Sequence, residues 1–328
     1  MTDKSLEILE QYALEEVQVR KGRGNYIIHS KNGDFVLKEY NGSEEKIELQ
    51  KVLTDHIVQS TEVSVQQIVE NKEGALFSKD QDGTLFTVQT YQEGRECDLK
   101  DRSDCMAAIH TMAHMHKGMY LEREQISQVA VPYSLKREFE KRNTELRRIR
   151  RYLREKRNKN DFERFLYSNF NPFFEKALEV EEEWNAYEPY SQPDGNVIAF
   201  SHGDYQHHNA WITGEQVMVL QFEKYLADLP CRDLYLFVRK LLEKNNWDQD
   251  VGKTILKEYE KERQLPLIER ISMAYRFSYP EKFWKIANFY FNSKKSFMPE
   301  KNMEKLEKLL EQEREKENFI GDILKKVL

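Results

Sequence analysis

The first 92 residues alternate between apolar and polar positions in short runs, and this pattern constrains the fold more than any other feature of the chain. Glycine and asparagine separate the runs, which predicts antiparallel strands joined by short turns. The three earliest runs are EVQVR (16–20), NYIIHS (25–30) and FVLKEY (35–40). We therefore expect the chain to begin with a small antiparallel sheet.

One helix is expected to interrupt this sheet. Residues 41–60 carry a candidate N-cap at Ser43, acidic residues in the first turn and apolar residues at helical spacing. Strand patterns return at 63–70 and in a hairpin at 74–92. The predicted N-terminal lobe, residues 1–92, thus holds five strands and one helix.

Helical patterns dominate after a short break in periodicity. The segment EGRECD (93–98) fits a hinge, and residues 99–328 read as a larger, mainly helical lobe with long charged helices at 133–158 and 161–185. Strand signals return there only around the segment VIAFSHGDYQHHNAWIT (197–213). The fold class predicted is α+β, with a sheet lobe followed by a helical lobe.

Composition excludes several classes of function. The net charge of −6 and the pI near 5.9 provide no global positive field to attract nucleic acid. No apolar run approaches the roughly 18 residues that a membrane span requires. Three scattered cysteines and an acidic N-terminus without a signal-peptide pattern favour cytoplasmic synthesis.

The loop SHGDYQHHN (201–209) and an earlier strand lysine carry the candidate chemistry. Phosphoryl transfer needs a lysine on the nucleotide phosphates, an acid that orients the attacking hydroxyl, and an amide and an acid that hold metal ions. Lys38, Asp204 and Asn209 occur in that order on a sheet-then-helix layout. Together they predict a protein-kinase-like architecture.

Three segments resemble the CotS family of bacterial spore coat proteins, within the aminoglycoside phosphotransferase and choline kinase class of protein-kinase-like folds. They are FSHGDYQHHN, DLPCRDLYLFVRKLL and YRFSYPEKFWKIANFYFNSKKSFMP, and the resemblance runs from about Val17 to Phe319. Pro280–Trp284 is its most family-specific part. The HGD triplet is shared by many small-molecule kinases.

The resemblance implies a role for each matching position. Lys38 would hold phosphates, Asp204 would be the catalytic base and Asn209 a metal ligand, while His202 and Asp233 would be structural, with Asp233 bracing the catalytic loop. It further implies ATP and Mg²⁺ as possible cofactors, a small-molecule substrate, other coat proteins as partners, and a spore coat destination.

Residue 221 departs from the family pattern. An aspartate, an aromatic or aliphatic residue and a second aspartate are usual, whereas this chain has Gln221, Phe222 and Glu223. A neutral amide cannot neutralise Mg²⁺, which prefers carboxylate and phosphate oxygens. Losing about 3–4 kcal/mol of transition-state stabilisation would slow transfer hundreds-fold or more.

Two further features of the expected nucleotide-binding site weaken the interpretation as an active enzyme. Glu223 could replace the missing carboxylate as a metal ligand only by reaching back about 6–7 Å along its strand. The glycine-rich element is also thin, with only Gly22 and Gly24 in KGRGN. ATP and Mg²⁺ binding is therefore expected to be weak or absent.

Several alternatives stay open at this stage. Lys38 could pair with Glu44, Glu45 or Glu48, and we favour Glu48 because it lies one turn deeper in the helix. His110 and His114 have zinc-compatible spacing, yet a structural role fits them better. The basic segment 136–159 reads as a helix with one apolar face, whose basic side is solvated or docks an acidic partner.

Three functions fit these observations. The first is a structural, scaffolding or nucleotide-binding component of the endospore coat with a degenerate kinase-like fold. The second is an active ATP-dependent phosphotransferase acting on a hydroxyl of a small molecule. The third, nucleotide sensing without transfer, lies between them.

Overall fold

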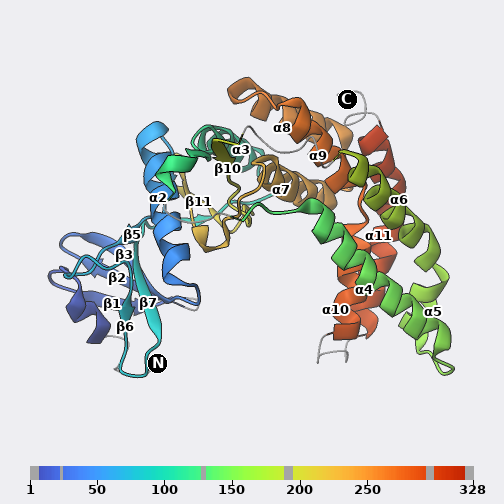
Figure 1. Cartoon of the computed structure of the whole chain (residues 1–328), viewed down its shortest axis with the longest axis horizontal. Helices are drawn as coiled ribbons and strands as arrows, with labels where there is room; N and C mark the ends of the chain where they lie inside the picture. The colour runs from blue at the N-terminus through green and yellow to red at the C-terminus, as the bar shows by residue number, and fades with distance from the viewer. Residues whose placement is uncertain (1–6, 23–24, 127–130, 188–194, 293–298, 322–328) are drawn as a thin grey trace. The chain divides into compact units, whose positions relative to one another are not determined.

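The computed structural model describes residues 7–22, 25–126, 131–187, 195–292 and 299–321 (Figure 1). The chain folds into two compact units, which are described separately below. Unit 1 comprises residues 1–131, 196–234 and 258–263, and unit 2 comprises 132–195, 235–257 and 264–328. No helix within the described ranges has the length and apolar character needed to cross a membrane.

Unit 1 begins with the antiparallel sheet that the alternating pattern predicts. Its strands are paired in the order β1-β2-β3-β7-β5, with β6 paired to β7. The bounds are β1 Gln18–Lys21, β2 Tyr26–Ser30, β3 Gly33–Glu39, β5 Ile68–Val69, β6 Ser78–Lys79 and β7 Leu85–Thr90. One face of this sheet buries Ile28, Leu37 and Val88 against the short 3₁₀ helix η1 (Ile8–Gln11).

Helix α2 (Glu44–Ser60) follows β3 and lies beside the sheet in Figure 1. The side chain of Ser43 accepts a hydrogen bond from the Lys46 amide, so the predicted N-cap is confirmed. Ile47, Leu53 and Ile57 recur at helical spacing and are buried. The packing of this apolar face holds the helix in place.

A second, four-stranded sheet in unit 1 supports the HGD loop. Its order is β4-β12-β11-β8, with bounds β4 Ser64–Val65, β12 Gln216–Val219, β11 Ala210–Thr213 and β8 Arg95–Glu96. Helix α3 (Arg102–Lys117) ends at Gly118 as predicted, and β9 (Tyr120–Glu122) pairs with β10 (Val197–Ala199). The HGD loop lies between β10 and β11.

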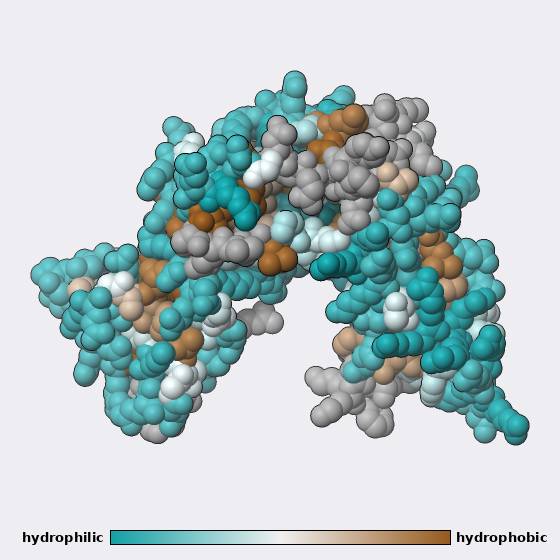
Figure 2. All heavy atoms as spheres, viewed as in Figure 1, coloured by the Kyte–Doolittle hydropathy of each residue, from teal (hydrophilic) through white to brown (hydrophobic). Residues whose placement is uncertain are grey.

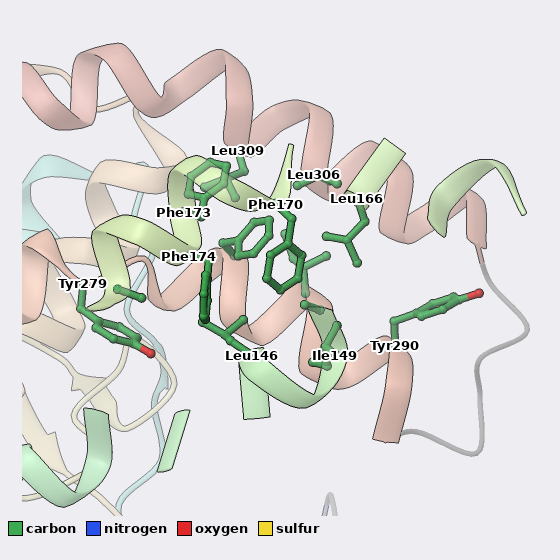
Figure 3. Close-up of a cluster of buried hydrophobic side chains, with 14 of the residues drawn as sticks. Leu146, Ile149, Leu166, Phe170, Phe173, Phe174, Tyr279, Tyr290, Leu306 and Leu309 are labelled. Carbon is green, nitrogen blue, oxygen red and sulfur yellow. The ribbon is translucent and has the colours of Figure 1, made fainter. Parts of the chain in front are cut away.

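Unit 2 is built from helices around an aromatic core. Its helices are α4 Leu135–Glu155, α5 Asp161–Ser168, α6 Phe170–Tyr187, α9 Leu267–Ser278, α10 Glu281–Asn292 and α11 Pro299–Phe319, with parts of α7 Cys231–Lys244 and α8 Gln249–Glu262. Phe170, Phe173, Leu146 and Leu306 converge between these helices (Figure 3). The predicted apolar face of α4 is buried there, and the visible surface over α4 and α5 is mainly hydrophilic (Figure 2).

The structure differs from the sequence-based expectation in three places. The strand expected at 63–70 divides into β4 and β5, which belong to different sheets. The helix expected at 161–185 breaks at Asn169, which caps α5 by donating its side-chain amide to the Phe165 carbonyl. The two compact units also part elsewhere than at residues 93–98, because unit 1 includes the HGD loop; the hinge itself stays a prediction.

Candidate functional site

The candidate site lies in unit 1, where β3 and the HGD loop bring together residues far apart in the sequence. Lys38 lies on β3 opposite Thr87, on the face away from the buried Leu37, because successive side chains of a strand alternate between faces. Its ammonium group forms an ion pair with the carboxylate of Glu223 in the 3₁₀ helix η4 (Phe222–Lys224).

This ion pair corrects the expectation that Lys38 pairs with an acid of α2. Glu44, Glu45 and Glu48 are all exposed residues in the first turns of that helix, where Ile47 and Leu49 take the buried positions. The side chains of Lys38 and Glu223 are 17% and 25% exposed. Gln89 on β7 also donates a hydrogen bond to Glu223, at 3.1 Å.

The pKa of Glu223 reflects this setting. Burial acts to raise it, but the charge and hydrogen bond of Lys38 hold the pKa of Glu223 below its usual value. The negative charge of Glu223 acts on Tyr40 in turn, whose pKa is raised to about 12, mainly by burial. Glu223 is therefore an ionised, partly buried carboxylate that already has a cationic partner.

The HGD loop is held by a buried carboxylate at the start of α7. Asp233 accepts hydrogen bonds from the backbone amides of His202, at 2.6 Å, and Gly203, at 2.9 Å. Gly203 has φ of +78°, and a Cβ at this position would lie 2.1 Å from the Lys224 carbonyl oxygen. Only glycine fits this close approach, which explains the central residue of the HGD triplet.

His202 is buried and structural in its contacts. Its Nε2–H donates to the Leu220 carbonyl at 2.7 Å, and its Nδ1 accepts from the Asp204 amide at 3.2 Å. Burial lowers the pKa of His202, so the ring is neutral in this tautomer. Phe222 packs edge-on against the ring at 4.5 Å between centroids.

Asp204 faces a lysine that sequence reasoning missed. The ammonium group of Lys224 lies 2.7 Å from the Asp204 carboxylate, and Gln206 donates to the other oxygen at 2.6 Å. Burial acts to raise the pKa of Asp204, but these two hydrogen bonds hold it below its usual value. The sequence around residues 221–224 does not predict this contact, because the turn of η4 brings Lys224 to Asp204 only in the folded chain.

Asn209 and Gln221 are the remaining candidate metal positions. Asn209 donates its side-chain amide to the Asp204 carbonyl at 2.8 Å, while its buried Oδ1 has no hydrogen-bond partner among the described residues. Gln221 has the left-handed backbone conformation, φ 61° and ψ 60°, and its backbone amide donates to the side-chain Oε1 of Gln66 at 3.3 Å. The left-handed conformation is uncommon for residues other than glycine and marks a specialised position.

The other candidate positions are less informative. Gly22 directly follows β1, and its backbone amide donates to the Asn25 carbonyl at 2.9 Å. Gly24 lies outside the described residues. His110 and His114 face Glu258 and Glu262, at 3.3 and 2.8 Å, and no cluster of three metal-binding side chains is found within the described part of the chain.

The sheet, the helix after its third strand and the HGD loop together define a protein with an aminoglycoside phosphotransferase-like kinase fold. The model of the family described as "Spore coat putative kinase YutH" matches residues 5–323. The chain belongs to this spore coat family, which confirms the CotS-like resemblance. The predicted spore coat destination is that of the family.

Solved structures confirm the fold. An aminoglycoside phosphotransferase from Alicyclobacillus acidocaldarius is similar with a TM-score of 0.82 at 17% identity, covering 98% of this chain and 95% of that one. Spectinomycin phosphotransferase APH(9)-Ia, in complex with ADP and spectinomycin, gives 0.62 at 12% identity over 98% and 97%. Amicoumacin kinase hAmiN, in complex with AMP-PNP and Ca²⁺, gives 0.59 at 12% identity over 97% and 92%. No curated protein sequence matches the chain.

Proposed function

We propose that this chain is a spore coat component in which the kinase-like site binds nucleotide weakly and does not support efficient phosphoryl transfer. One observation carries the proposal. At the position where the family usually has a metal-binding aspartate, Gln221 follows β12 in a left-handed conformation and precedes the buried Phe222. An amide at this position offers a metal ion no negative charge.

The residues around Gln221 do not fit a Mg²⁺ ion well. The buried Oδ1 of Asn209 is available as a neutral ligand. Both nearby carboxylates already have lysine partners, Glu223 with Lys38 and Asp204 with Lys224. A hard divalent cation would have to displace an ammonium group to reach either carboxylate, and the repulsion between the two cations opposes this.

The same ion pair also limits nucleotide affinity. A phosphate group that engages Lys38 must first separate it from Glu223, and the carboxylate then repels the phosphate. The binding free energy is reduced by the cost of breaking that contact. A scaffolding role, with the kinase-like fold kept as a folded body in the coat, is consistent with such a site.

The second candidate is an active phosphotransferase, favoured by the presence of Lys38, Asp204 and Asn209 in one site. In that case Asp204 would orient the acceptor hydroxyl after Lys224 moves away. Lys38 would bind the nucleotide phosphates after leaving Glu223. Both lysines would then need a different position in the nucleotide-bound state.

Thermal unfolding with ATP, with and without Mg²⁺, distinguishes the two. A ligand at a concentration equal to its Kd stabilises by only about 0.4 kcal/mol, and at a thousand times its Kd by about 4 kcal/mol. With millimolar ATP we expect a small shift in Tm that is the same with and without Mg²⁺. A large Mg²⁺-dependent shift that Lys38→Ala abolishes would contradict the proposal and support the active enzyme.

The variant Gln221→Asp tests directly whether the missing carboxylate at residue 221 limits metal and nucleotide binding. If the missing carboxylate is the defect, this variant gains Mg²⁺-dependent ATP binding and raises any ATP turnover. Gln81→Asp, at an exposed residue of the turn after β6, is a control for the added charge. If Gln221→Asp behaves like the wild type and the control, the defect lies elsewhere and the argument from residue 221 fails.

A further inference from the structure

Unit 2 contains a cavity of about 180 Å³ that no part of the proposed kinase site uses. It is lined mainly by residues of α7, α11 and the start of α10, with single residues of α6 and α9 and loop residues after α7 and α9. Phe173, Tyr279 and Leu309, three of the lining side chains, are labelled in Figure 3. Its wall therefore borders the aromatic core of this unit.

The cavity lining is strongly basic, in contrast to the net charge of −6 of the whole chain. Seven lining residues are basic and three are acidic. The basic residues are Arg239, Lys240, Lys244, Lys282, Lys305, Lys308 and Lys316, and the acidic residues are Glu243, Glu281 and Glu313. This leaves a formal excess of four positive charges around one small space.

The three acids are already neutralised by neighbouring cations. Glu243 forms ion pairs with Arg239 and, at 3.0 Å, with Lys282. Glu281 lies 3.7 Å from Arg239 and 2.6 Å from Lys285, and Glu313 lies 3.0 Å from Lys316. The three acids are thus already paired with Arg239, Lys282 and Lys316, three of the seven basic lining residues.

Four lining lysines have no ion-pair partner in the described part of the chain. Lys240 and Lys244 lie one turn apart on α7, and Lys305 and Lys308 lie one turn apart on α11. Among the described residues, the ammonium group of Lys305 lies over the ring of Phe289, 5.6 Å from its centroid. Two helices thus present paired positive charges to the same cavity.

The pKa of Lys240 is lowered in this setting. Burial is the main cause that lowers the pKa of its ammonium group, and the positive charges of Lys282, Arg239 and Lys244 lower it further against the opposing effect of Glu243. The buried Nε of Arg239 also has no hydrogen-bond partner among the described residues. An anion in the cavity would relieve the repulsion between these positive charges and would accept hydrogen bonds from the cationic side chains that line it.

We propose that this cavity binds a small anion that carries at least two negative charges, such as a phosphate monoester or a polycarboxylate. The four lysines without acidic partners determine the sign and multiplicity of the ligand charge. The limited volume selects a small molecule, and the aromatic wall accommodates its carbon skeleton. The site is independent of the nucleotide proposal, because it uses none of the residues named there.

Calorimetric titration of the full chain tests the ligand class. Inorganic phosphate, glucose 6-phosphate and citrate are titrated at constant ionic strength, with glucose as the uncharged control, up to about 10 mM, which nearly saturates a millimolar site. We expect at least one of the three anions to bind and glucose not to bind. Absence of binding by all three anions, or equal binding of glucose, would overturn the proposal.

A matched pair of double variants locates the site. Lys240→Gln with Lys244→Gln removes two charges that line the cavity, whereas Lys253→Gln with Lys257→Gln removes two charges of the same spacing on α8 that do not line it. We expect the cavity variant to weaken anion binding about tenfold or more and the control to change it less than about twofold. Equal effects of the two variants would mean an adventitious surface ion only, and would refute the site.

Unfolding curves of both double variants exclude a trivial loss of structure. Removing two mutually repelling lysines is expected to leave the Tm of the cavity variant equal to or above that of the wild type. A Glu243→Gln variant gives an opposite test, because it frees Arg239 and Lys282 to contribute positive charge. It should gain more stability from added anion than the wild type does, and an equal or smaller gain would contradict the charge argument.

Discussion

The ion pair between Lys38 and Glu223 makes the sharpest prediction for the candidate site. A double-mutant cycle with Lys38→Met, Glu223→Gln and the combined variant isolates the interaction between the two residues. Each single variant leaves one partly buried charge without its ion-pair partner. The double variant removes both charges and keeps an amide that can bond to Gln89.

The structure sets the size of the effect. Removing one partner of a fully buried ion pair costs about 3–5 kcal/mol. Because the side chains of Lys38 and Glu223 are 17% and 25% exposed, solvent screens part of that cost. We expect each single variant to lose about 2 kcal/mol and the double variant about 1 kcal/mol, which gives a coupling energy of about 3 kcal/mol.

The coupling depends on pH in a defined direction. The pKa of Glu223 is lower in the folded protein than in the unfolded chain, for which 4.5 is the reference value. Its contribution to stability is therefore complete above the unfolded pKa and is lost as the pH falls through the folded pKa. The coupling energy measured at neutral pH should shrink steadily as the pH is lowered from about 5 towards 3.

Urea unfolding followed by far-UV circular dichroism measures these energies at each pH, and ATP titration without Mg²⁺ adds a functional readout. Glu223→Gln should bind ATP more tightly than the wild type, because Lys38 no longer has to leave a carboxylate. Additive single effects at neutral pH would show that the ion pair contributes nothing. Weaker ATP binding by Glu223→Gln would refute the competition between Glu223 and the nucleotide.

Two further predictions concern the packing of each unit. Gly203→Ala would place a Cβ 2.1 Å from the Lys224 carbonyl oxygen at a φ of +78°, so the free energy of unfolding should fall by about 3 kcal/mol or more. The urea midpoint should fall with it, and a midpoint like that of the wild type would refute the close approach. Phe283→Ala removes a fully buried ring that stacks on Phe173 with 4.4 Å between centroids, and it should lower the free energy of unfolding by about 3–5 kcal/mol. Phe289 is 52% exposed, so Phe289→Ala should lower it by less than about 1 kcal/mol. Equal losses of Tm in the two variants would contradict the assignment of the core.

The sequence alone determined the features that depend on neighbours along the chain. The Ser43 cap, the antiparallel strands β2 and β3 and the apolar face of α4 follow from local patterns, and each one appears in the structure as expected. Local hydrogen bonding and side-chain periodicity explain why these signals are reliable.

Only the tertiary structure decided the partners of the charged residues. Lys38 and Glu223 lie 185 residues apart in the sequence, and no local pattern favours Glu223 over the three acids of α2. The contact of Lys224 with Asp204, the parallel pairing of β4 with β12 and the basic cavity likewise depend on segments that meet only in the folded chain. The attraction between two charges depends on their distance in space. The spacing of these residues along the sequence does not predict that distance, because they lie on different segments of the fold.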